Sequence, residues 1–143
     1  MNIAYFIKPK SGTAYTYDIS TVRQGMERMR HHGFSAIPVL TKDGKYFGTV
    51  TEGNVLWFLC GDPAADAEKT KIGEIIRPDR TKPLNLFSTL EELLQKAMEM
   101  NFVPVVDDRG CFVGIVTRKD VIRFCAENCI AVPSPDNESK ESK

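Results

Sequence analysis

The sequence predicts an α+β fold in which one strand–helix–strand–strand–helix (βαββα) unit occurs twice. Gly48-Thr49-Val50-Thr51 and Gly114-Ile115-Val116-Thr117 share one design and lie 66 residues apart. Ile37-Pro38-Val39 and Val103-Pro104-Val105 recur at the same offset, which indicates a tandem duplication. Since half of a 143-residue chain forms only a marginal core, we expect the copies to pack their apolar faces together.

The duplication divides the chain into two repeats, a linker and a tail. The first repeat is expected at residues 1–60 and the second at residues 71–131. Residues 61–70 form the linker, which is small, polar and too short for the repeats to move far apart. After Val132 the chain has no apolar residue to bury, so residues 132–143 are expected to be disordered.

Local patterns place the elements of the first repeat. The apolar segment at residues 3–10, which closes at Pro9, is expected to dock rather than to form a full element. Ser20 is a candidate N-cap for a helix with apolar residues at helical spacing, and Gly33 ends that helix. The remaining elements are strands at residues 13–19, 36–40 and 45–50, and a helix that begins at residue 51.

The second repeat is expected to follow the same order. Ser88-Thr89-Leu90-Glu91 has the pattern of a capping box and precedes an apolar helical stripe. Asp107-Asp108-Arg109-Gly110 is a turn that joins two strands into a hairpin. The elements are strands at residues 82–87, 103–106 and 111–116, and helices from residue 88 and from Arg118 to about Cys129.

Composition and charge exclude several classes of partner. The 19 basic and 19 acidic residues balance, so no overall field attracts the chain to nucleic acid or to anionic lipid. No apolar run approaches the length of a membrane helix, and the first six residues lack the pattern of a signal peptide. We therefore expect a cytoplasmic protein that binds neither nucleic acid nor membrane.

Neither a metal site nor an active site is expected. The four cysteines show no paired spacing within a repeat, which is typical of a reducing compartment. Cys125 and Cys129 would share a helical face, but no second close ligand pair completes a zinc site. The adjacent His31 and His32 have no serine and aspartate pattern around them, so we do not expect an enzyme.

Thr117-Arg118-Lys119-Asp120 is the candidate binding segment. It follows a short apolar strand and begins a helix, whose free N–H groups and positive dipole end favour an anion. The Asp120 carboxylate could accept hydrogen bonds from a vicinal diol, so the segment could hold a ribose phosphate. The same pattern is also ordinary helix capping, and this alternative stays open for Asp120 and for the basic pair.

A βαββα repeat that occurs twice, with a strand proline and a Gly-x-x-Thr-x-x-Asp segment, resembles the cystathionine-β-synthase (CBS) domain pair. The resemblance extends from about Tyr5 to Cys129. It implies a disc-like, pseudo-twofold (Bateman-type) module, often dimeric, that binds adenosine-containing ligands in clefts between the repeats. The usual role of such a module is regulatory rather than catalytic.

The resemblance also implies roles for residues of the second copy. Asp120 would bind the ribose hydroxyls, and Thr117 the ribose or a phosphate, with Arg118 or Lys119 as a phosphate contact. The base would pack on Ile115 and lie against the main chain at Asn101, Phe102 and Val103. Ala36 and Ile37, with Asn101–Val103, resemble the equivalent residues of stand-alone bacterial CBS proteins that sense cyclic di-adenylate.

The first copy departs from the family pattern. Thr51 matches, but Asn54 stands where the family prefers aspartate and lacks its charge. Glu52-Gly53 replaces the basic pair, and a carboxylate there would repel phosphate. Both copies also lack the histidine or arginine that some nucleotide-binding members carry just before the strand proline.

Two functions follow from the resemblance. The favoured one is a stand-alone regulatory module that binds AMP, ADP, ATP or cyclic di-adenylate in the inter-repeat cleft and modulates an unidentified partner protein. It requires no cofactor beyond this regulatory ligand. The alternative is a degenerate pair that acts as a structural or dimerisation module without ligand. In either case we expect a homodimer, with Trp57 packed in the core or at the dimer face.

Overall fold

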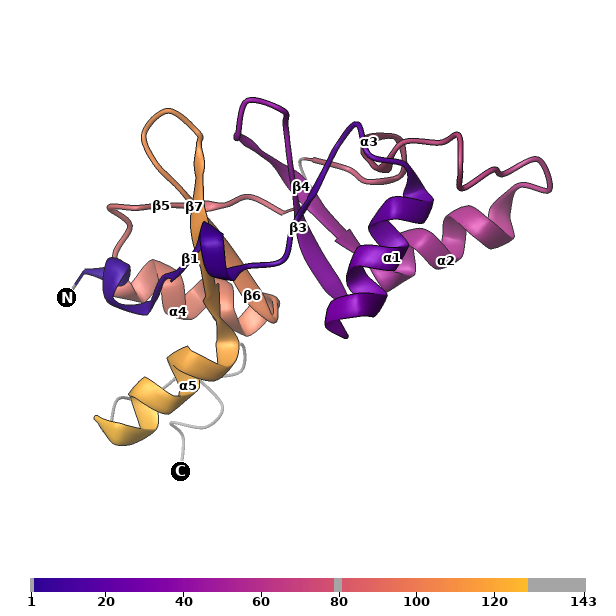
Figure 1. Cartoon of the computed structure of the whole chain (residues 1–143). Helices are drawn as coiled ribbons and strands as arrows, with labels where there is room; N and C mark the ends of the chain where they lie inside the picture. The colour runs from indigo at the N-terminus through magenta and orange to yellow at the C-terminus, as the bar shows by residue number, and fades with distance from the viewer. Residues whose placement is uncertain (1, 79–80, 129–143) are drawn as a thin grey trace.

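The structure is a computed structural model of the 143-residue chain, and it describes residues 2–78 and 81–128 (Figure 1). It contains two βαββα repeats side by side, which confirms the predicted α+β fold. The first repeat consists of β2 (Thr16–Tyr17), α1 (Val22–His32), β3 (Ala36–Leu40), β4 (Tyr46–Thr51) and α2 (Glu52–Gly61). The second consists of β5 (Leu84–Asn85), α4 (Leu90–Glu99), β6 (Phe102–Val106), β7 (Phe112–Thr117) and α5 (Arg118–Glu127).

Short additional elements precede each repeat. Before β2 lie the 3-10 helix η1 (Ile3–Phe6), the strand β1 (Lys8–Pro9) and the 3-10 helix η2 (Lys10–Gly12). The short helix α3 (Ile72–Ile75) precedes β5. The end of the second repeat beyond residue 128 and the tail at residues 132–143 lie outside the described residues. Each described helix falls short of the length and apolar character that a membrane crossing requires.

The two sheets have the same plan. β2 is parallel to β3 and β3 antiparallel to β4, and β5, β6 and β7 repeat this pairing. β2 pairs only with Val39 and Leu40, so residues 36–38 form an edge that faces no other described strand. Pro38 fits this edge because it has no N–H group to leave unpaired. β5 likewise pairs only with Val105 and Val106 and leaves Pro104 beyond its end.

The first helix of each repeat begins one residue later than the sequence pattern predicted. The N-caps are Thr21 and Thr89, whereas the pattern placed them at Ser20 and Ser88. The Thr21 hydroxyl accepts the Gln24 N–H at 3.1 Å, and the Gln24 side chain accepts the Thr21 N–H at 2.9 Å. Ser20 does not cap because its carbonyl accepts the Ile72 N–H from the start of α3. Gly33 ends α1 as expected, at φ +70°.

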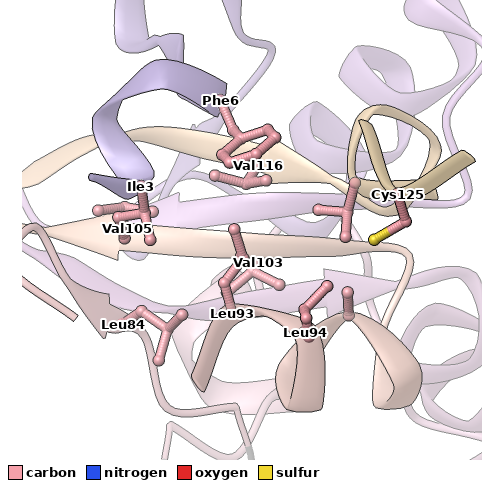
Figure 2. Packing of buried hydrophobic residues seen from close by; sticks show 11 residues of the cluster. Ile3, Phe6, Leu84, Leu93, Leu94, Val103, Val105, Val116 and Cys125 are labelled. Atoms are coloured by element: carbon pink, nitrogen blue, oxygen red, sulfur yellow. The ribbon is translucent and has the colours of Figure 1, made fainter. Parts of the chain in front are cut away.

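Each repeat completes its core with a segment that precedes the other repeat. Ile3 and Phe6 of η1 pack among Leu93, Val103 and Val116 of the second repeat (Figure 2). Ile72 and Ile76, from the segment after the linker, pack in the core of the first repeat. The linker also contacts the first repeat, because the carbonyl groups of Ala67 and Thr70 accept hydrogen bonds from the first N–H groups of α1. The repeats therefore share their cores rather than only touching each other.

Two equivalent glycines allow these segments to approach the sheets. β1 pairs antiparallel with β7, so that Pro9 lies opposite Gly114. A Cβ atom at Gly114 would lie 2.1 Å from the Lys8 carbonyl oxygen. At Gly48, 66 residues earlier, a Cβ atom would lie 3.1 Å from Ile76 Cδ1. Gly114 and Gly48 thus hold equivalent positions in the two sheets. Each lies against the segment that precedes the other repeat.

The tips of the two hairpins form a second joint between the repeats. The Tyr46 N–H donates to the Gly110 carbonyl at 3.2 Å, and the Phe112 N–H donates to the Gly44 carbonyl at 2.9 Å. The Tyr46 and Phe112 rings stack with their centroids 6.4 Å apart. The core exchange and the hairpin joint together fix the space between the two sheets.

We expect Gly114→Ala to destabilise the chain more than Gly48→Ala. The new methyl group at 114 meets rigid backbone, which costs about 1–3 kcal/mol of unfolding free energy, whereas at 48 it meets the flexible end of Ile76 and costs less than about 1 kcal/mol. Urea unfolding of both variants and the parent chain measures the difference. Equal losses at the two glycines would show that β1 is not held against β7 in solution.

Candidate functional site

A cleft of about 210 Å³ lies between the two repeats and contains the second-copy motif. We call it the Thr117 cleft. The first repeat contributes Phe34, Ser35 and the free edge of β3, and the second contributes residues of β6 and β7. The N-terminal segment closes another side. The structure thus brings together six of the residues singled out in the sequence, namely Ala36, Ile37, Asn101, Phe102, Ile115 and Thr117.

Thr117 stands at the junction of β7 and α5. Its hydroxyl accepts the Asp120 N–H at 3.2 Å and so caps α5. Thr117 also lines the cleft, so the same side chain caps α5 and borders the candidate site. Ile115, two residues earlier on the same face of β7, supplies an apolar wall beside it.

The cleft also contains three residues that the sequence motifs did not indicate, namely Lys8, Thr13 and Phe34. Lys8 reaches this cleft because β1 pairs with β7, where Lys8 lies opposite Ile115. It is the charged residue among the described residues that line the cleft. The one signal in the sequence was the match between Ile7-Lys8-Pro9 and Ile76-Arg77-Pro78, which does not reveal that the segment crosses to the other repeat.

The pseudo-twofold axis generates a second cleft, of about 230 Å³, which we call the Thr51 cleft. Thr51 there corresponds to Thr117, and Thr49 to Ile115. Ala36, Asn101 and Phe102 line both clefts, so the two share one wall. The charged residues of the Thr51 cleft are Glu99 and Arg118, so the charge of the two clefts differs.

The Asn54 side chain takes part in the capping box at the start of α2. Its amide oxygen accepts the Thr51 N–H and the Thr51 hydroxyl, both at 2.9 Å. The Thr51 hydroxyl oxygen in turn accepts the Asn54 N–H at 3.1 Å. Asn54 is not among the described residues that line the Thr51 cleft, because this cap holds its side chain beside the helix start.

The two residues of the basic pair, Arg118 and Lys119, have different surroundings and do not act as a unit beside Thr117. Arg118 turns toward the Thr51 cleft, where its Nε donates to the Ala97 carbonyl at 2.7 Å and a terminal nitrogen donates to the Met98 carbonyl at 3.4 Å. These carbonyls belong to the last turn of α4, where a cation is favourable. Lys119 is exposed and lines neither cleft.

Asp120 and Val103 also lie outside the lining of the Thr117 cleft. Asp120 borders a neighbouring cavity of about 240 Å³ with Tyr5 and Phe124, and its Oδ1 lies 3.5 Å from an Arg123 terminal nitrogen. Val103 is fully buried in the core opposite Val116. Val103 lies outside the cleft while its neighbour Phe102 lines it, because successive residues of β6 point to opposite faces of the sheet.

One tyrosine near the Thr51 cleft has a shifted pKa. Burial raises the pKa of Tyr46, and its hydroxyl lies 2.7 Å from the Thr49 hydroxyl. Tyr46 therefore stays neutral at physiological pH and orients Thr49 on the wall of the cleft. Within residues 2–78 and 81–128 no group of three His, Cys, Asp or Glu side chains could hold a metal ion.

Comparisons with known proteins agree on one family. The family model "CBS domain" matches the chain twice, at residues 15–61 and 72–127. Curated protein sequences gave no match. Solved structures similar to this chain include CbpB in complex with c-di-AMP, which has 27% sequence identity and a TM-score of 0.80. That similarity covers 91% of this chain and 86% of the other.

Two further structures share the fold. CbpB from Streptococcus agalactiae is 25% identical, with a TM-score of 0.75 over 92% of this chain and 87% of that chain. CBSX2 in complex with AMP is 19% identical, with a TM-score of 0.75 over 90% of this chain and 98% of that chain. The paired arrangement of the two repeats is therefore common to this chain and to these proteins.

We expect Arg118→Gln to destabilise the chain and Lys119→Gln to leave its stability nearly unchanged. Loss of the charged hydrogen bonds to the end of α4 should lower the unfolding free energy by about 1.5–3 kcal/mol. Removal of the exposed Lys119 charge should change it by less than about 0.5 kcal/mol. Chemical unfolding of the two variants tests this, and equal effects would show that Arg118 does not hold α4.

Proposed function

The chain belongs to the CBS domain family, and from this premise we propose that it is a regulatory module that binds an adenosine-containing nucleotide and modulates a partner protein. The nucleotide is AMP, ADP, ATP or cyclic di-adenylate, and it binds in the Thr117 cleft. One observation carries the proposal: this cleft gathers a hydroxyl, a cation and apolar side chains from both repeats and the N-terminal segment.

Each part of a nucleotide has a matching group in the Thr117 cleft. The base packs against apolar walls formed by Phe102 and Ile115, and the free edge of β3 at Ala36 and Ile37 offers main-chain groups for its polar rim. Thr117 binds the ribose or a phosphate at the positive end of α5. The Lys8 ammonium group neutralises the phosphate. The resemblance to CbpB with c-di-AMP supports a ligand of this class.

Asp120 remains our candidate for the ribose hydroxyls. Its carboxylate lies beside Arg123 in a partly exposed pair, and such pairs contribute only about 0.2–1 kcal/mol. Hydrogen bonds to a charged group contribute about 1.5–3 kcal/mol each. A rotation of Asp120 from Arg123 to a bound ribose is therefore favourable. Lys119, at the same helix start, is free to approach a second phosphate.

The Thr51 cleft is less suited to an anionic ligand. Glu99 repels phosphate, Asn54 is held in the cap of α2, and Arg118 is bound to the end of α4. These observations favour the second candidate, a degenerate module without ligand, for the first copy alone.

We propose that the chain forms a homodimer through α2. Leu56, Trp57 and Leu59 of this helix are exposed by 54%, 74% and 46%. A helix that carries apolar residues on all its sides is normally covered. We further propose a cytoplasmic and non-catalytic role without a required cofactor. The unpaired state of Cys60, Cys111 and Cys125 is consistent with a reducing compartment.

The proposed function predicts that c-di-AMP or a linear adenine nucleotide stabilises the chain. A ligand at 100 times its Kd should add about 2.7 kcal/mol to the unfolding free energy. Thermal unfolding with AMP, ADP, ATP and c-di-AMP identifies the ligand, and calorimetry gives its Kd. Lys8→Gln and Asp120→Asn should each weaken binding by about tenfold, as expected for about 1.4 kcal/mol.

Lys42→Gln, at the exposed tip of the first hairpin, is the matched control and should bind as the parent chain does. Asp120→Asn should also leave the melting temperature without ligand nearly unchanged. A large fall in that temperature would make Asp120 a structural helix residue. The absence of binding by all four nucleotides would favour the module without ligand.

The homodimer predicts that Trp57→Glu produces a monomer. A charge on this exposed residue would be buried unpaired in the dimer, while the fold of one chain has little need of the indole. Phe87→Glu is the control, because Phe87 is equally exposed, by 77%, but lies in the loop before α4. Sedimentation at micromolar concentration should show dimers of the parent and control chains. A monomeric parent chain would contradict the proposal.

A further inference from the structure

Phe34 belongs to two cavities at once. It lines the Thr117 cleft, and it also lines a groove of about 690 Å³ between α1 and α2. We call the second cavity the α1–α2 groove, and its apolar residues include Met26, Met29, Leu56 and Leu59. Ser35 is the other residue that lines both. A change in the Phe34 ring therefore alters the cleft and the groove together.

The backbone holds Phe34 in place while its side chain stays open to solvent. Gly33 adopts φ +70°, and the Phe34 N–H donates to the Met29 carbonyl at 3.0 Å. The Phe34 side chain is nevertheless 51% exposed, which is unusual for an aromatic residue that borders two cavities. Its ring stacks parallel to the exposed His32 ring, with centroids 6.1 Å apart. The ring thus borders the cleft and the groove from a half-exposed position.

The same segment is joined to the start of α2. The Glu52 N–H donates to the Ser35 carbonyl at 2.9 Å, and Glu52 and Gly53 line the groove. The equivalent hydrogen bond in the second repeat joins Arg118 to Asn101, but Met100 and Glu99 stand there in place of Phe34 and Gly33. The aromatic ring and the left-handed glycine are therefore features of the first repeat.

We propose that Phe34 couples ligand binding in the Thr117 cleft to the α1–α2 groove. A nucleotide base in the cleft stacks on the ring and draws it away from the groove, which uncovers the groove side of Met26 and Met29. This removes the ring from beside the face of α2 through which, under the proposed function, a second copy of the chain binds, and so loosens that contact. The inference rests on that function and names the residue by which the ligand acts on the helical face.

Linkage makes the effect reciprocal. If the ligand opens the groove, occupation of the groove changes the affinity of the cleft by the same factor. Couplings of this kind are commonly between about 5-fold and 150-fold. Because one side chain is shared, removal of its ring should abolish the coupling while ligand binding, though weaker, continues through Thr117, Lys8 and Ile115.

Hydrogen–deuterium exchange of α2, residues 52–61, tests the proposal with c-di-AMP as the probe. Each chain is measured without ligand and at a c-di-AMP concentration that calorimetry shows to be saturating for that chain. In the parent chain we expect c-di-AMP to accelerate exchange in α2 by about fivefold, at the lower end of common couplings. Phe34→Ala should bind c-di-AMP more weakly and show no acceleration, whereas Phe34→Tyr should restore it.

Phe87→Ala is the control, because Phe87 is an exposed phenylalanine that lines neither the cleft nor the groove. It should respond as the parent chain does. The coupling is overturned if the parent chain binds c-di-AMP without a change in α2, or if Phe34→Ala keeps the acceleration. If calorimetry finds no binding of c-di-AMP to the parent chain, the proposed ligand fails and the coupling fails with it, which distinguishes this outcome from the other two.

Discussion

The exchange of apolar segments between the two repeats is the constraint on which the rest of the structure depends. Ile3 and Phe6 complete the core of the second repeat, and Ile72 and Ile76 complete that of the first. Half of this chain would form only a marginal core alone, so the exchange adds apolar residues that each copy lacks. The exchanged segments also tie the two repeats together and fix the walls of the space between them.

The clefts follow from the same exchange. A parallel strand of only two residues runs beside β3 and beside β6, so the first half of each central strand keeps a free edge. The strand prolines are compatible with that edge because they carry no N–H group. The segment that crosses from the first repeat then pairs with β7 and brings Lys8 to the cleft beside Thr117. The pairing of β1 with β7 therefore also assembles one side of the Thr117 cleft.

Local features of the sequence predicted the fold and some of the residues that line the Thr117 cleft, but not the features that depend on contacts distant in the sequence. The repeated motifs gave the βαββα order and the positions of Ile115 and Thr117, because strand ends and helix caps are encoded by neighbouring residues. Lys8 could not be predicted, since its place depends on a pairing across more than a hundred residues. The orientation of Arg118 toward α4 and the use of Asn54 in a cap also depend on neighbours that the motif does not contain.

Sequence differences between the two repeats make the two equivalent clefts chemically different. The backbone places equivalent residues at the two clefts, yet Lys8 supplies positive charge to one while Glu99 supplies negative charge to the other. Glu99 occupies the position of Gly33, so the residue that disfavours an anion in the Thr51 cleft replaces the left-handed turn that precedes Phe34. One divergence between the repeats thus gives the two clefts different charged side chains. It also restricts the left-handed turn and the Phe34 ring to the first repeat, where they border the groove between α1 and α2.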